Sequence, residues 1–262
     1  MIGLGSNLVN PPPPPKYKHI WQLSNYGDLD VYFDFSLLSA DHGSEVVAVT
    51  NLSSVGTPSN YNITSNVGNP LVDTSTMVLT SIAFDGASDD ILNMANAWTS
   101  SDKEFTLFMT LKKSDGTNDF FITKSSDDIS SSIKITGTDN ANVVIDMTDI
   151  GSPRTIAMNN TNPSSSTVNY SMGTVNTSLV VRRTSAGNVA IYAQEGLYVA
   201  FNSNVNLQNG STFTWGAIGG SESSTDWGGN IGEVGIYDAD IGEDNAIILV
   251  QELAKKWGAV NP

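Results

Sequence analysis

The stretch that decides the fold is Asp226–Gly258, which reads DWGGNIGEVGIYDADIGEDNAIILVQELAKKWG. Its first half alternates in the manner of a β-strand and begins with Trp-Gly-Gly. Its second half changes to helical periodicity and stops at Lys-Lys-Trp-Gly. No other part of the chain has the pattern of this second half, so the sequence predicts a protein of strands and loops that ends on one helix.

The predicted helix covers residues 243 to about 257. Acidic Glu243 and Asp244 occupy its first turn, and Lys255 and Lys256 its last, an arrangement that suits the helix dipole. Gly242 and Gly258 can start and end it. One apolar stripe follows the spacing i, i+3, i+4, i+7, i+8 and i+11, and consists of Ala246, Leu249, Val250, Leu253, Ala254 and Trp257. We therefore expect the helix to lie against the sandwich and to cover either exposed sheet or an open edge.

The rest of the chain reads as short strands between turn signals. The clearest is residues 104–113, EFTLFMTLKK, where Phe105, Leu107, Met109 and Leu111 share one face. The predicted strands are residues 31–35, 45–49, 77–84, 104–113, 119–124, 132–136, 142–148, 178–184, 188–194, 195–201, 212–218 and 230–237. Many short strands without alternating helices favour an all-β, antiparallel β-sandwich or jelly roll, which we assign as one domain over residues 17–262.

Residues 1–16 are predicted to form an extended arm. Gly3–Ser6 is flexible, and Pro11–Pro15 favours a polyproline II rod. The residues expected to dock this arm onto a larger assembly are Ile2, Leu4, Leu8, Val9, Pro11 and Pro15. The segment lacks the basic start and continuous apolar run of a secretory signal.

The charge and the cysteine content of the chain exclude some classes of binding partner and some kinds of chemistry. The formal net charge is −15, with 12 basic and 27 acidic residues, so nucleic acid and acidic membrane surfaces are disfavoured as partners, and no run is long enough for membrane insertion. There is no cysteine, which excludes disulfides and thiolate chemistry.

Several segments together resemble the concanavalin A-like lectin/glucanase superfamily, in its laminin-G-like branch. They are Tyr32–Asp34, Ile82–Gly86 with Asp89–Leu92, Glu104–Met109, Ile218–Gly220, Trp227–Tyr237 and the helix ending Ala254–Gly258. The resemblance implies a concanavalin-like jelly roll over most of residues 30–258. Domains of this type that have a short Gly-Leu-Gly leader are frequent in bacteriophage virion proteins. The superfamily includes lectins, hydrolases and inert structural modules, so fold alone fixes no function.

The sequence offers little for catalysis. Glucanases of this fold use paired acids in a Glu-x-Asp pattern, which is missing here, and Asp146 and Asp149 would point to opposite faces of a strand. The only histidines are His19 and His42, and no Gly-x-Ser-x-Gly elbow accompanies them, so a serine hydrolase or a histidine zinc site is disfavoured. We expect a protein that is not an enzyme.

Two weaker patterns in the sequence leave calcium binding and sugar binding as alternatives. Asp85, Asp89 and Asp90 offer hard oxygen ligands for calcium, as do Asp238, Asp240 and Asp244, although ordinary turn and helix-start chemistry is the favoured interpretation of both groups. No other cofactor is indicated. A sugar could stack on an exposed aromatic ring, for which the candidates are Trp98, Trp227 and Tyr198. Of these, Trp98 is expected to be the exposed one.

The main hypothesis is a non-enzymatic structural or display protein of a virion: a capsid decoration, head-fibre or tail-associated subunit. It would be assembled in the host cytoplasm, anchored to other virion proteins by its arm, and exposed on the particle surface. The alternative is a carbohydrate-binding adhesin module that recognises host surface glycans. Self-association into a symmetric oligomer is compatible with either.

Overall fold

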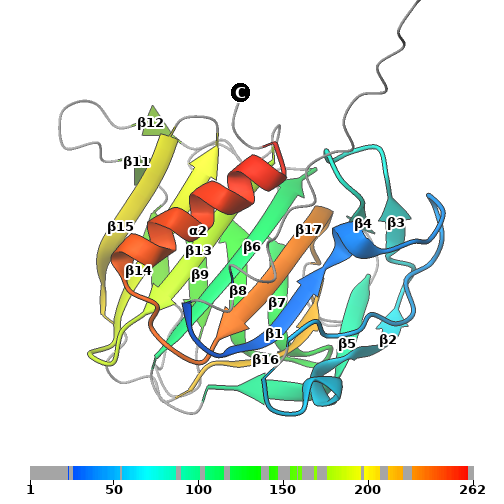
Figure 1. Cartoon of the computed structure of the whole chain (residues 1–262), viewed down its shortest axis with the longest axis horizontal. Helices are drawn as coiled ribbons and strands as arrows, with labels where there is room; N and C mark the ends of the chain where they lie inside the picture. Colours follow the sequence, from blue (N-terminus) through cyan, green and yellow to red (C-terminus); the bar gives the residue numbers. More distant parts are fainter. Residues whose placement is uncertain are drawn as a thin grey trace, which may run out of the picture.

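The computed structural model describes residues 23, 26–53, 55–86, 90–100, 104–114, 119–136, 142–146, 154–157, 159–160, 168–169, 176–195, 198–206, 212–220 and 226–258. Within these residues two antiparallel sheets face each other, and an α-helix lies on the outside of the larger sheet (Figure 1). This arrangement confirms the predicted β-sandwich with a C-terminal helix. The predicted arm, residues 1–16, lies outside the described residues, so the division into arm and sandwich stays a prediction.

Each sheet is assembled from strands that are distant in the sequence. The larger sheet has the neighbour order β15 (Tyr198–Asn206), β14 (Asn188–Glu195), β13 (Thr177–Arg183), β6 (Phe105–Lys113), β17 (Gly228–Tyr237), β4 (Ser81–Asp85) and β3 (Leu71–Asp73), and β1 (Leu29–Asp34) also pairs with β17. The smaller sheet has the order β10 (Arg154–Ala157), β9 (Asn142–Asp146), β8 (Asp128–Thr136), β7 (Asp119–Ser125), β16 (Thr214–Ile218), β5 (Ile91–Thr99) and β2 (Ile63–Val67). The remaining elements are the pair β11 (Asn159–Asn160) and β12 (Val168–Asn169), the 3-10 helices η2 (Phe35–Leu37) and η3 (Pro58–Tyr61), and helix α2 (Glu243–Lys256).

Strand β17 is the centre of the larger sheet. It pairs with β6 along one edge, while β4 and β1 lie end to end along the other edge. All ten of its residues are buried, because the second sheet covers one face and α2 and its flanking segments cover the other. A side chain at Gly232 would collide with the Trp257 ring, 2.5 Å from an ideal Cβ, so glycine lets that indole lie directly on the strand.

The two apolar layers follow from the strand pattern. Alternate residues of β6 point inward, so that Phe105, Leu107, Met109 and Leu111 join the core between the sheets, whereas Phe108 joins the layer under α2. The helix contributes its predicted stripe to that outer layer, and Leu249, Val250 and Leu253 are each at most 1% exposed. Each such buried side chain stabilises the fold by about 1.5–3 kcal/mol.

Two predicted strands were placed wrongly. Residues 45–49 form only isolated bridges at Glu45 and Val49. The Val46 N–H donates to the Pro70 carbonyl, but Pro70 has no N–H with which to extend a ladder. The strand predicted over residues 77–84 begins only at Ser81, because Asp73 caps the preceding turn through the N–H groups of Ser75 and Thr76.

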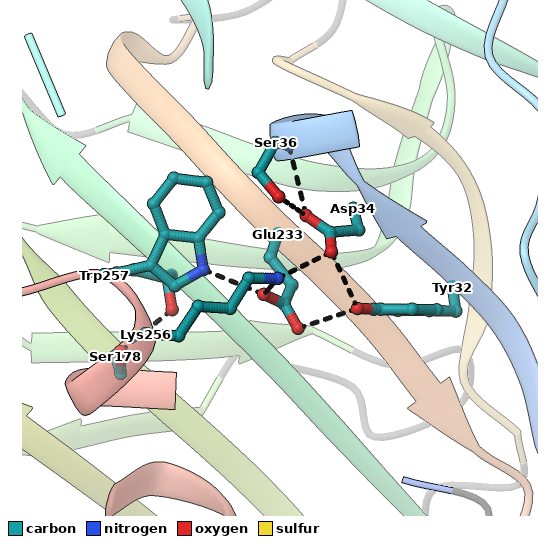
Figure 2. Close-up of polar contacts among 8 residues, drawn as sticks. Tyr32, Asp34, Ser36, Ser178, Glu233, Lys256 and Trp257 are labelled. Atoms are coloured by element: carbon teal, nitrogen blue, oxygen red, sulfur yellow. Dashed lines mark hydrogen bonds and ion pairs between the residues drawn. The ribbon is translucent and has the colours of Figure 1, made fainter. Parts of the chain in front are cut away.

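The end of α2 is fixed to β17 by a buried ionic cluster, which consists of Asp34, Glu233 and Lys256 (Figure 2). The Lys256 Nζ lies 2.6 Å from Asp34 Oδ2 and also contacts Glu233 Oε2. These residues are 4% (Lys256), 6% (Asp34) and 0% (Glu233) exposed. Asp34 and Glu233 are register partners on β1 and β17, so the ammonium group binds the two strands at one point.

Aromatic and hydroxyl groups complete this ionic cluster. Trp257 Nε1 donates to Glu233 Oε2 at 2.8 Å, and the Tyr32 hydroxyl lies 3.0 Å from Glu233 Oε1 and 3.3 Å from Asp34 Oδ2. The other oxygen of Asp34 accepts hydrogen bonds from the backbone N–H and hydroxyl of Ser36 (Figure 2). Every carboxylate oxygen of the cluster therefore has a partner, as burial of charge requires.

Removal of Lys256 would leave two carboxylates buried without a cation. We expect Lys256→Met to lower the free energy of unfolding by about 3–5 kcal/mol, the range for breaking a buried ion pair from one side. Urea denaturation followed by tryptophan fluorescence measures this change.

The neighbouring residue gives a matched control. The Lys255 side chain is 63% exposed and pairs only with Glu252 across one helical turn, so Lys255→Met should change the stability by less than about 1 kcal/mol. Equal effects of the two substitutions would contradict the anchoring role of Lys256.

Candidate functional site

The buried ionic cluster has the chemistry of an active site but no access to solvent. Burial, followed by the charges of Glu233 and Asp34, raises the pKa of Tyr32 well above its usual value, so the phenol keeps its proton and acts as a donor. Because Lys256 is also buried, a soluble substrate has no route to these groups in the folded chain. A surface site for a ligand must be sought elsewhere.

The prediction that Trp98 is an exposed platform for sugars was wrong. The ring is 1% exposed and belongs to the core between the sheets, opposite Trp215 on β16. The exposed neighbours of Trp98 misled the prediction, because β5 alternates and turns Trp98 inward. Trp227 is also fully buried, against Phe121.

The calcium candidates divide into described and undescribed residues. Asp90 is 4% exposed, and its two oxygens accept the backbone N–H groups of Asn69 and Asp85, which is turn chemistry. Asp240 is bound by Arg182 and caps the Gly242 N–H before α2. Over the part of the chain that the structure describes, no three His, Cys, Asp or Glu residues form a group that could hold a metal ion.

Other predicted positions have no structural test. Asp89 and the arm residues Ile2, Leu4, Leu8, Val9, Pro11 and Pro15 lie outside the described residues, as does the side chain of Tyr198. No helix in the described part of the chain is long and apolar enough to cross a membrane.

The best surface candidate is a group at one end of the sandwich that we call the Tyr61 rim. It comprises Asp30, Asn60, Tyr61, Asn96 and Asp238. These residues come from β1, η3, β5 and the segment that follows β17. Asn60 and Asn96 are exposed, while Tyr61 is half-buried against the core and keeps part of its surface open.

Buried polar contacts hold the Tyr61 rim in place. Asn51 is 3% exposed and donates through its side chain to the carbonyls of Asp30 and Pro58, so it ties β1 to η3. Asn96 Nδ2 donates to the Asn60 carbonyl at 3.0 Å, which ties η3 to β5. The rim is thus fixed by regular elements rather than left on a free loop.

The electrostatics of the Tyr61 rim are unfavourable for its own stability. Burial raises the pKa of Asp30; the hydrogen bond from Trp98 Nε1, 2.8 Å long, opposes this rise, and the charges of Asp238 and Asp28 add to it. Burial and then Asp30 and Asp238 raise the pKa of Tyr61. Groups whose pKa values are shifted by burial and by neighbouring charges, as in Asp30 and Tyr61, are a physical sign of a functional site.

Sequence reasoning missed most of this rim. Tyr61 sits in SNYN, which reads as a turn, and nothing local marks it as a partner of Asp30 or Asp238. The one usable signal was Trp98, whose indole N–H reaches the rim although its ring does not. The aromatic residue chosen from the sequence therefore positions a rim carboxylate instead of contacting solvent.

Comparisons with known proteins find similar folds among solved structures. No family model matches the chain, and no curated protein matches it. Among solved structures, domain 4 of AbnA, a GH43 extracellular arabinanase from Geobacillus stearothermophilus solved in complex with arabinotriose, has a TM-score of 0.53 at 15% identity, over 86% of this chain and 98% of that one.

Two toxin domains match to the same degree. The binding domain of Paraclostridial Mosquitocidal Protein 1 has a TM-score of 0.53 at 12% identity, over 86% of this chain and 52% of that one. The binding domain of botulinum neurotoxin serotype D has a TM-score of 0.53 at 12% identity, over 87% of this chain and 51% of that one. At such identities the likeness establishes the fold alone: the chain has a β-sandwich fold similar to that of these three domains.

Proposed function

We propose that the protein is a carbohydrate-binding module and that the Tyr61 rim is its binding surface. The observation that carries this proposal is the half-buried Tyr61 ring held beside the carboxylate of Asp30, whose ionised form is disfavoured by its surroundings. An aromatic face bordered by hydrogen-bonding groups suits a sugar ring, which has one apolar face and a polar edge.

The charges of the Tyr61 rim favour neutral sugars. Ionised Asp30 and Asp238 only accept hydrogen bonds, and sugar hydroxyls donate them, while Asn60 and Asn96 can do both. An acidic sugar would bring a third negative charge to a rim that already holds two, in a chain of formal net charge −15. The proposed ligand class is therefore neutral oligosaccharides.

The comparisons support this function over the virion display role. The AbnA domain that covers the same fold was solved with arabinotriose, and the two toxin domains are named as binding domains. Virion assembly, an anchoring arm, exposure on a particle and oligomerisation stay predictions from the sequence. So does the expectation that the chain is not an enzyme.

Tyr61→Ala should remove the aromatic face. We expect the affinity for a neutral oligosaccharide that binds the wild-type chain to fall about tenfold or more, the effect typical of a central aromatic contact. A glycan array followed by calorimetric titration measures it, with sialylated glycans on the same array expected to stay blank.

Tyr26→Ala is the matched control. Tyr26 is likewise a partly buried tyrosine, but it packs beside Tyr237 on the side of α2, and its loss should leave sugar binding unchanged. If neither substitution changes binding, or if folded wild-type chain binds no neutral glycan, the proposed function is wrong.

The substitution Asp30→Asn tests whether the ionised Asp30 carboxylate lowers the free energy of unfolding while it contributes to sugar binding. A carboxyl whose pKa is higher in the folded protein than in the unfolded chain holds its proton more tightly when folded, so its ionised form lowers stability above that raised pKa. The variant should therefore be more stable than wild type at pH 7. This advantage should shrink as the pH falls through the raised pKa and vanish below about 3.9, the ordinary aspartate value.

Stability and binding should then move in opposite directions. Urea denaturation across this pH range measures the stability, and calorimetric titration measures the binding affinity. Asp41 is exposed, so the control Asp41→Asn should change neither the stability nor the affinity. A variant that loses stability at pH 7 would identify Asp30 as a structural residue instead.

A further inference from the structure

The buried ionic cluster places an amine against a carboxyl group with the parts needed to join them. Lys256 Nζ lies 2.6 Å from Asp34 Oδ2, inside a layer lined by Tyr32, Phe108 and Trp257. We propose that Lys256 and Asp34 form an amide bond, an isopeptide cross-link made by the folded chain itself, with Glu233 as the proton carrier. This proposal is independent of sugar binding.

The carbonyl carbon of Asp34 is prepared for attack. Asp34 Oδ1 accepts the Ser36 backbone N–H at 3.1 Å and the Ser36 hydroxyl at 2.6 Å. These donors stabilise the negative charge that develops on Oδ1 when the amine adds to the carbon. Oδ2, on the side of Lys256, is then the oxygen that leaves.

A hydrogen-bonded path connects the nucleophile to the leaving oxygen. Lys256 Nζ contacts Glu233 Oε2, which can take a proton from the ammonium group. Glu233 Oε1 lies 3.0 Å from the Tyr32 hydroxyl, and that hydroxyl lies 3.3 Å from Asp34 Oδ2 (Figure 2). Tyr32 can thus pass a proton to the leaving oxygen while Glu233 replaces it.

The reaction balances without a co-reactant. The Lys256 ammonium and the Asp34 carboxylate become one neutral amide and one water. The N–C bond forms and the C–Oδ2 bond breaks. Of the three ammonium hydrogens, two leave with Oδ2 as water and one stays on the amide nitrogen, and Glu233 ends as the carboxylate it was. Exclusion of water and fixed geometry both favour amide formation, and a buried amide needs less solvation than two buried ions.

The bond would close a very long loop. Asp34 ends β1, and Lys256 ends α2, 222 positions later. A cross-link between them ties the first strand of the larger sheet to the last helix, so the two ends of the described sandwich cannot separate when the chain is denatured.

Denaturing mass spectrometry of the intact full-length chain tests the proposal. The folded wild-type protein should be about 18 Da lighter than its sequence requires, because one water has left. Lys256→Arg should have its full sequence mass, since a guanidinium stays protonated and does not attack. Lys255→Arg, the adjacent control, should keep the loss of water.

Trypsin digestion locates the bond. In the chain without the cross-link, trypsin cleaves after Lys103, Lys255 and Lys256 and gives separate peptides over residues 19–103 and 257–262. The cross-link blocks cleavage after Lys256 and joins residues 19–103 to residues 256–262 in one branched species. Asp34→Asn should form the same bond with loss of ammonia, about 17 Da, in place of water. Glu233→Gln, if folded by circular dichroism, should remain at full mass because it cannot take the proton.

Two outcomes would overturn the proposal. Wild-type chain that is folded and has its full sequence mass means that Lys256 and Asp34 remain an ordinary ion pair. A loss of water that persists in Lys256→Arg means dehydration at another place, such as the Asp85–Gly86 bond.

Discussion

The contact of Lys256 with Asp34 and Glu233 is the constraint on which the architecture depends. Strand β17 has β4 and β1 end to end along one edge, and Asp34 faces Glu233 near the junction. Lys256 and Trp257 close that point from the end of α2, and Gly232 leaves room for the indole. Two carboxylates on adjacent strands would repel each other in a buried layer, so the sheet, its register and the helix require the same cation.

The ionic cluster and the proposed binding surface lie in different parts of the molecule. Helix α2 and its apolar layer cover the outer face of the larger sheet, so the ionic cluster is buried among the residues that the structure describes. The Tyr61 rim lies instead where β1, η3 and β5 meet, and Asn51 and Trp98 fix it through buried hydrogen bonds. Rigid support of this kind suits recognition, because a preorganised site loses less entropy on binding.

Stability and function place different demands on the acidic groups of this chain. In the ionic cluster Lys256 offsets the charge of the carboxylates, and Trp257, Tyr32 and Ser36 donate hydrogen bonds to them. Asp73 is similar: burial raises its pKa, but hydrogen bonds from Thr76, Ser75 and Asn230 outweigh burial and lower it overall. At the Tyr61 rim Asp30 has Trp98 as its donor, and its pKa stays raised. The raised pKa of Asp30 and the lowered pKa of Asp73 are the physical basis for assigning these carboxyl groups different roles.

By itself the sequence determined the sheet-rich fold class, β6, β17 and α2, because alternation and helical spacing are local patterns that each element carries whole. It misplaced residues 45–49, where Val46 donates to the distant Pro70 carbonyl, and residues 77–84, where the turn capped by Asp73 delays the start of the strand. Only the tertiary structure decided that Trp98 is buried, that Asp30 lies near Tyr61, and that Lys256 is buried whereas Lys255 is exposed. These facts depend on contacts between residues far apart in the chain, which no local pattern records.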